Sequence, residues 1–163
     1  MWLKKPKELN KQQGIAFGVM DGVVNVLGVL LALSVATESK VAIITGVLAA
    51  GIANALANSS GFYVSEETEG IYTQKDIITS TVLAFISSFF SAVVVLLPTF
   101  IFNLKTGLWL GFLIGILMLF TIGYIFSHAN RKIAAKIGFK YVVLGAAVSL
   151  LGFLIGLLVQ RWL

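Results

Sequence analysis

The sequence of 163 residues contains no cysteine, one histidine and two prolines, and it is poor in charged side chains. The lack of cysteine excludes disulfides, thiolate metal sites and cysteine nucleophiles. Charged residues make up 12% of the chain, about half the share found in typical soluble domains. Hydrophobic residues make up 58%, and the mean hydropathy is +0.98. This composition excludes a small soluble enzyme and indicates an integral membrane protein.

The hydrophobic residues form five stretches, each reaching the roughly 20 apolar residues that a helix needs to cross a bilayer. The stretches cover residues 14–36, 41–63, 77–102, 107–127 and 138–160. They lack the polar–apolar alternation of membrane β-strands, and the first is too long for a cleavable signal peptide. We therefore expect an all-α, multi-pass membrane protein with a single five-helix domain over residues 1–163.

Lysine and arginine are distributed unequally between the two ends of the expected helices. With five crossings, one side of the membrane receives nine of the twelve basic residues. These are Lys4, Lys5, Lys7, Lys11, Lys75, Arg131, Lys132, Lys136 and Lys140, whereas the other side receives Lys40, Lys105 and Arg161. The positive-inside rule then predicts a cytoplasmic N-terminus and an external C-terminus. Attraction to anionic lipid of the bilayer accounts for the net charge of +5, so no nucleic-acid partner is expected.

Asp21 is the only ionisable residue in the stretch 14–36. A carboxylate at membrane depth costs at least about 2.5–3.5 kcal/mol, and chains retain one mainly where it faces a protein-lined or watery pathway. Asp21 is therefore a candidate functional residue. The alternative is a neutral, structural carboxyl group that hydrogen-bonds a neighbouring helix.

Small and polar residues recur at alternating spacings of three and four, which places them on one helical face. In the first two stretches these sets are Gly14, Gly18, Asp21, Asn25, Gly28 and Ala32, and Gly51, Asn54, Asn58, Gly61 and Ser65. Close helix packing in lipid explains the small residues, but it does not require oxygen-bearing side chains on two adjacent helices. The candidate cation ligands in these helices are Asp21, Asn25, Asn54 and Asn58.

Four of the seven acidic residues lie in segment 65–76, namely Glu66, Glu67, Glu69 and Asp76. We expect this segment to be a cytoplasmic loop. If the second helix continues into it, Gly70 should end that helix. Because carboxylates are ligands of hard cations, Glu66, Glu67 and Glu69 are candidate metal ligands at a cytoplasmic mouth. The alternative is a plain solvated connector.

The same stretches resemble the vacuolar iron transporter family. GVMDGVVNVLGVLLAL in the first stretch is similar to the family's first helix with its Asp-Gly pair, and GIANALANSSGFYVSEETE in the second is similar to its helix ending in Gly-Glu-Tyr-Val-Ser. The LLP of the third stretch and GAAVSLLGFLIGLL of the fifth also fit, in order, over nearly the whole chain. The long acidic, methionine-containing insertion between the second and third helices is missing, so the chain resembles a short member.

The resemblance assigns roles by position. Asp21 matches the first-helix aspartate implicated in moving the metal, and Asn25 falls where a small polar residue is usual. Asn58 falls where the family often has a methionine ligand, and Phe62 replaces the glutamate of Gly-Glu-Tyr-Val-Ser. Glu69 matches a carboxylate or amide position just beyond the helix.

The resemblance implies a homodimer with the pathway between its subunits. Five helices are too few to enclose a pathway, so the burial of Asp21 independently favours a partner, with two copies of Asp21 facing each other across a two-fold axis. Oxygen ligands suit Mn²⁺ or Fe²⁺ better than Cu⁺. Two nearby carboxylates in a low dielectric do not both stay ionised without a cation. Metal entry would then displace a proton, as metal/proton antiport requires.

The function expected from the sequence is export of Fe²⁺ or Mn²⁺ from the cytoplasm, across the cell membrane of a prokaryote. The metal is the cargo, and no cofactor is expected. An enzyme is not expected, because an intramembrane hydrolase needs a nucleophile–base pair or a catalytic metal site and the only histidine, His128, falls at a helix end. The remaining alternative is a membrane packing or assembly protein that transports nothing.

Overall fold

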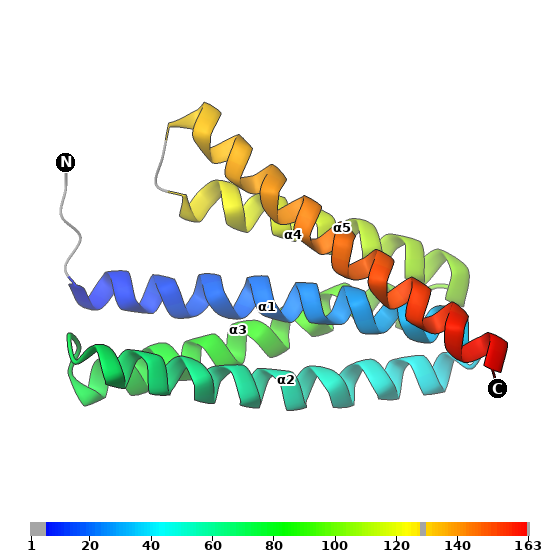
Figure 1. The fold of residues 1–163 in the computed structure, drawn as a ribbon, viewed down its shortest axis with the longest axis horizontal. Helices are drawn as coiled ribbons and strands as arrows, with labels where there is room; N and C mark the ends of the chain where they lie inside the picture. Colours follow the sequence, from blue (N-terminus) through cyan, green and yellow to red (C-terminus); the bar gives the residue numbers. More distant parts are fainter. Residues whose placement is uncertain (1–5, 128–129, 163) are drawn as a thin grey trace.

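The computed structural model describes residues 6–127 and 130–162, and five long α-helices account for almost all of them (Figure 1). The helices are α1 (Pro6–Ala36), α2 (Lys40–Glu69), α3 (Gln74–Ile101), α4 (Leu104–Phe126) and α5 (Arg131–Trp162). All five are long and apolar enough to cross a membrane, as the sequence predicts. His128, Lys4 and Lys5 lie outside the described residues.

Polar side chains cap the starts of the helices. Ser39, Thr73 and Asn103 each accept a hydrogen bond from the backbone N–H three residues further on, and Asn130 does the same at the start of α5. Such caps satisfy backbone donors that the first turn of a helix leaves free. The connections between the helices are consequently short.

The acidic segment 65–76 is mostly helical, so its prediction as a loop is wrong. Gly70 ends α2 with a φ of 64°, a left-handed conformation that glycine adopts without strain. Thr73 then starts α3, and its hydroxyl also donates to Asp76 Oδ2 at 2.8 Å. Glutamate favours helices, and the cap at Thr73 begins the next helix only four residues after the last one ends. The connector is therefore only residues 70–73.

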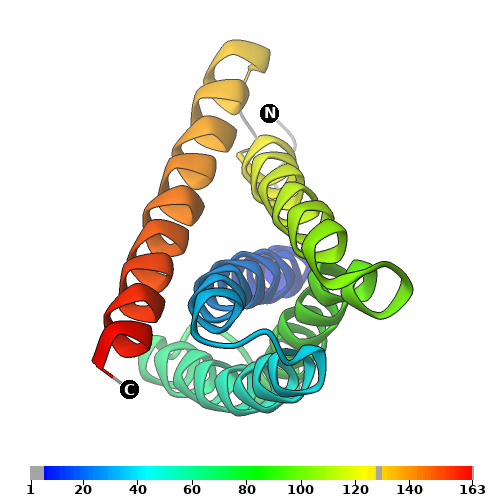
Figure 2. The ribbon, with the colours of Figure 1, turned by 90° about the vertical axis from the view of Figure 1, so that its right-hand side faces the viewer.

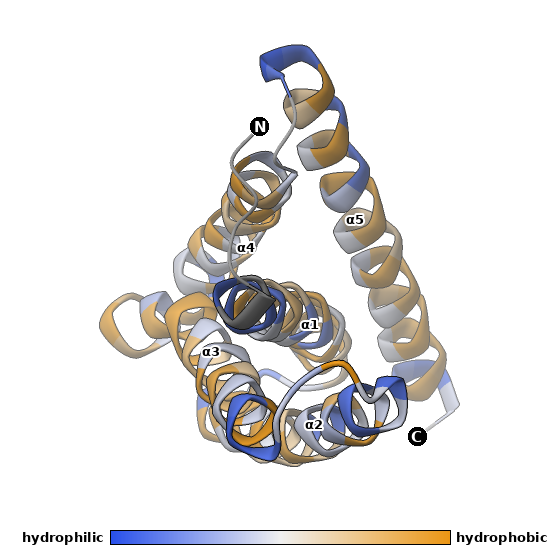
Figure 3. Cartoon of the chain, turned by 90° about the vertical axis from the view of Figure 1, so that its left-hand side faces the viewer, coloured by the Kyte–Doolittle hydropathy of each residue, from blue (hydrophilic) through white to orange (hydrophobic). Residues whose placement is uncertain are grey.

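Helix α1 lies at the centre of the bundle, with the other four helices around it (Figure 2). Its side chains Val23, Val26, Leu27 and Leu30 are fully buried. The outer surfaces carry large exposed hydrophobic side chains, and α5 is hydrophobic along most of its length but hydrophilic at its start (Figure 3). The protein thus presents an apolar exterior around a central helix that is itself only partly buried.

Glycines bring the backbones of α1 and α3 into direct contact. A Cβ atom added at Gly14, Gly18 or Gly22 would lie only 2.2–2.3 Å from a backbone oxygen of α3. Those oxygens belong to Ser80, Ala84 and Ser88, so the contacts advance along both helices in the same direction. Close backbone approach of this kind drives helix association in lipid, where hydrophobicity alone cannot.

The small residues predicted to share one face of α1 in fact face three neighbours. Gly14 and Gly18 pack on α3, Asp21 contacts α2, and the carbonyl oxygens of Gly28 and Ala32 lie against α5. A strict three–four spacing drifts by about 20° per heptad on a straight helix, and α5 crosses α1 obliquely (Figure 1). A central helix therefore distributes one sequence stripe among several partners.

The α1–α3 contact predicts opposite effects for two glycine substitutions. Gly18→Ala should lower the stability of the folded protein by about 1–3 kcal/mol, because overpacking forces a backbone shift. Gly61→Ala is the control, since a Cβ there meets no atom within 4 Å while both changes gain the same ~1 kcal/mol of helix propensity. Thermal unfolding in detergent measures the difference. Equal unfolding midpoints for the two variants would contradict the described contact.

Candidate functional site

Asp21 lies at the midpoint of α1, and two asparagines of α2 donate hydrogen bonds to it. The Nδ2 atom of Asn54 lies 2.5 Å from Asp21 Oδ2, and Asn58 Nδ2 donates to the same oxygen. Asn58 Nδ2 also lies 3.0 Å from Asn54 Oδ1. All three side chains are half-buried. We call Asp21, Asn54 and Asn58 the central cluster.

The helical hairpin of α1 and α2 brings the central cluster together. The two helices are joined by residues 37–39, and Asp21 lies about as far before this turn as Asn54 lies after it. Asn54 and Asn58 are four residues apart, so they occupy neighbouring positions on one face of α2. The length of the hairpin therefore places both amides opposite the single carboxylate.

The carboxylate of Asp21 is only partly satisfied. The hydrogen bonds from the two amides both reach Oδ2, whereas Oδ1 accepts none from any residue that the structure describes, and no lysine or arginine among them pairs with Asp21. The free oxygen can take a proton or coordinate a cation.

Asn25 does not join the central cluster by a hydrogen bond. It lies one turn beyond Asp21 on α1, is half-buried, and makes no side-chain hydrogen bond within residues 6–127 and 130–162.

The face predicted for α2 is not buried along its whole length, because Gly61 and Ser65, which lie beyond Asn58, are exposed. The buried positions of α2 from Ile43 to Ser59 recur at every fourth residue.

The three glutamates at the end of α2 point to different partners. Glu66 is only 6% exposed and accepts a hydrogen bond from Nδ2 of the fully buried Asn10 in α1. Glu67 accepts hydrogen bonds from Tyr63 and Gln74 at 3.2 and 3.0 Å. Glu69 is exposed. They are therefore not a single convergent ligand set, and the described part of the chain contains no group of three His, Cys, Asp or Glu that could hold a metal ion.

The sequence predicts Glu66 as a candidate metal ligand, but it does not predict the buried contact that Glu66 makes with Asn10 between α2 and α1. Asn10 precedes the hydrophobic stretch, but it continues the four-residue spacing of Gly14 and Gly18, and this signal could have identified it. Tyr72 in the connector lies near the same pair. Burial, followed by the nearby carboxylates of Glu66 and Glu69, raises the pKa of Tyr72.

An aromatic pair lies between the two polar groups. The rings of Phe17 and Phe62 stack with their centroids 5.4 Å apart. Phe17 is one turn before Asp21 on α1, and Phe62 is one turn beyond Asn58 on α2. The α1–α2 hairpin thus presents the Asn10–Glu66 pair, then an apolar pair, then the central cluster.

Comparison with known proteins gives little further information. No family model matches the chain, and no solved structure matches it. The chain is similar to an uncharacterized protein of Methanocaldococcus jannaschii, with 26% identity over 90% of this chain and 91% of the relative. The similarity therefore extends over almost the full length of both proteins, and the relative's name assigns it no function.

Proposed function

We propose that the protein transports divalent metal ions across a membrane and that the central cluster is its metal-binding site. The observation that carries this proposal is the half-satisfied carboxylate of Asp21 at the midpoint of a helix long enough to span a bilayer. Ionisable groups at such depth are costly and typically mark ion pathways or proton relays. The glycines and buried aliphatic side chains of α1 pack against the other helices without a charged group.

The ligand chemistry suits a hard divalent cation. A carboxylate oxygen and amide oxygens favour Mn²⁺ or Fe²⁺ over Cu⁺, which prefers sulfur. Rotating an asparagine amide by half a turn exchanges its donor for its acceptor. Asn54 and Asn58 can therefore donate to Asp21 through Nδ2 when no metal is bound, and offer Oδ1 to a metal that arrives.

One subunit supplies a single carboxylate, so we propose that a homodimer completes the site. Asp21, Asn25, Asn54 and Asn58 are all half-buried in the single chain. A second copy related by a two-fold axis would cover this polar face and add a second Asp21. Two carboxylates brought together in a low dielectric hold a proton or a cation between them, and exchange of one for the other is metal/proton antiport.

The row of residues along the α1–α2 hairpin suggests a route for the ion. With the N-terminus in the cytoplasm, Glu66 would be the first buried carboxylate that an outgoing ion meets. The stacked Phe17 and Phe62 would then separate it from Asp21. An apolar constriction between two polar sites can limit leakage by excluding water. The proposed cargo is Fe²⁺ or Mn²⁺, and the proposed location is the cell membrane of a prokaryote.

A packing or assembly protein without transport activity is the competing function. The glycine contacts of α1 with α3 and α5 are sufficient for such a role. Metal flux into liposomes that contain the purified protein distinguishes the two functions, because a packing protein moves no metal.

Substitution of Asp21 tests the proposed site directly. Asp21→Asn keeps the size of the side chain but removes the charge and the proton site. We expect folding and dimerisation to persist while Mn²⁺ flux into liposomes falls roughly tenfold or more, since loss of a charged ligand costs at least about 1.4 kcal/mol. Glu38→Gln is the control, because it removes an exposed carboxylate in the turn between α1 and α2. Wild-type flux in Asp21→Asn would refute the role of Asp21.

Substitution of Asn58 tests metal selectivity. Asn58→Met replaces a hard amide oxygen with a soft thioether, which should shift the flux ratio from Mn²⁺ toward Fe²⁺ or Co²⁺. Ala57→Met introduces the same side chain at the adjacent exposed position and should leave the ratio unchanged. If Asn58 only joins two helices, the Mn²⁺/Fe²⁺ ratio of Asn58→Met will equal that of the wild type.

The exposed acids at the end of α2 allow a separate test of metal recruitment. The double change Glu67→Gln and Glu69→Gln should raise the metal concentration for half-maximal flux at low salt and leave maximal flux nearly unchanged. The effect should vanish at 1 M salt, where the screening length falls to about 3 Å. The buried Glu66 is left intact so that packing against Asn10 is preserved. Equal half-maximal concentrations at low salt would identify this end as a plain connector.

A further inference from the structure

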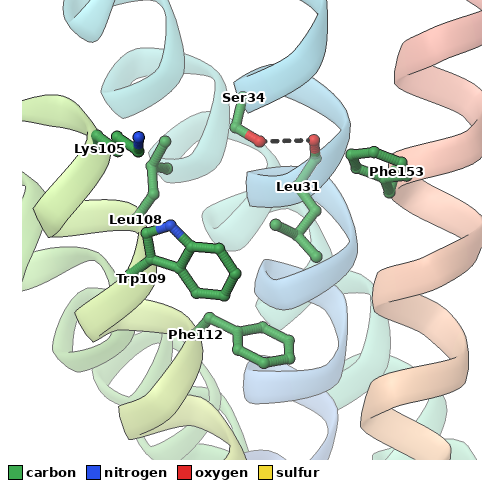
Figure 4. A pocket seen from close by; sticks show the side chains of 7 residues that line it. All are labelled: Leu31, Ser34, Lys105, Leu108, Trp109, Phe112 and Phe153. Atoms are coloured by element: carbon green, nitrogen blue, oxygen red, sulfur yellow. Dashed lines mark hydrogen bonds between the residues drawn. The ribbon is translucent and has the colours of Figure 1, made fainter.

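An apolar pocket lies between α1, α4 and α5, near the end of the bundle where α4 begins (Figure 4). Its volume is about 310 Å³, about twice that of an apolar cavity that holds one benzene molecule. Its lining residues are Leu31, Ser34, Lys105, Leu108, Trp109, Phe112 and Phe153. The pocket shares no residue with the central cluster.

The walls of this pocket are almost entirely apolar. Leu31, Leu108 and the rings of Phe112 and Phe153 supply most of the lining (Figure 4). The only hydroxyl group, that of Ser34, already donates to the backbone oxygen of Leu31 at 2.8 Å. The apolar part of the pocket therefore offers no partner to a polar solute, whereas a hydrocarbon chain would fit its chemistry.

The polar atoms of the pocket are two donors at one end of it. Lys105 and Trp109 are four residues apart on α4 and thus occupy the same face. Both are exposed, Trp109 by 67%. Neither the Lys105 ammonium nor the Trp109 indole N–H has a hydrogen bond or ion pair with any residue the structure describes. Both donors are free to bind a negatively charged group.

We propose that this pocket binds an anionic phospholipid, with one acyl chain between α1, α4 and α5 and the phosphate at Lys105. A bilayer supplies an apolar chain and an anion in one molecule, which matches the two parts of the pocket. Lysine places its charge at the headgroup level while its stem lies along apolar surface, and tryptophan concentrates at the same level.

A second pocket of similar size contains no charged residue, so the charge of Lys105 distinguishes the proposed site. The second pocket is lined by Val19, Ile114, Leu117, Met118, Thr121 and Ile122. The proposed site at Lys105 does not depend on the transport function.

Quenching of Trp109 fluorescence by brominated lipid tests the proposal. Trp2→Phe and Trp162→Phe make Trp109 the only tryptophan, and the protein is reconstituted in mixtures of brominated and ordinary lipids. We expect dibrominated phosphatidylglycerol to compete for the site about fivefold better than dibrominated phosphatidylcholine, from the attraction of one lysine to anionic lipid. Lys105→Gln should abolish this preference while quenching by phosphatidylcholine persists, because the apolar part of the pocket is unchanged.

Arg161→Gln is the matched control, because it removes an exposed positive charge near the end of α5 that does not line the pocket. It should retain the preference for phosphatidylglycerol. Equal quenching by the two lipids in the protein with Lys105 would overturn the proposal. Equal loss of preference in Lys105→Gln and Arg161→Gln would also overturn it, because the preference would then reflect general surface charge.

Discussion

Backbone contact between α1 and α3 determines where the other side chains of α1 can point. Because Gly14, Gly18 and Gly22 hold one face of α1 against the α3 backbone, rotation of α1 about its axis is restricted. Asp21, next to Gly22 in sequence, is then directed toward α2 and the amides of Asn54 and Asn58. The close backbone contact of α1 with α3 thereby fixes the position of the Asp21 carboxyl group against α2.

Within α1, the residues that stabilise the fold differ from the residue proposed to bind metal. The contacts of α1 with α3 and α5 use glycines and backbone oxygens and need no charged group. The carboxyl group of Asp21 is not required by that packing, yet two amides donate hydrogen bonds to it and one of its oxygens accepts none from the described residues. The free oxygen of Asp21 is thus available for a contact that the packing of α1 does not supply.

Much of the fold follows from local sequence signals, and much of the site does not. Five apolar stretches predict five helices, and Gly70 predicts the end of α2, which its positive φ confirms. The prediction of a loop over 65–76 is wrong because it followed the high charge of this segment, which indicates solvent exposure. It gave less weight to the helix propensity of the glutamates. The burial of Glu66 against Asn10 depends on how far α1 extends beyond its apolar residues, and hydropathy does not report that. Similarly, periodicity selects Asp21, Asn54 and Asn58 as candidates, but only the hairpin geometry shows that Asn25 stands apart from their hydrogen bonds.

We propose above that the protein moves divalent metal in exchange for protons. The most direct measurement uses liposomes that contain the purified wild-type protein, a metal-sensitive dye inside and a pH-sensitive dye beside it. Addition of external Mn²⁺ should produce metal entry faster than in protein-free liposomes, together with an opposite movement of protons. Metal entry at the rate of protein-free liposomes would contradict transport, and metal entry without any proton movement would contradict antiport.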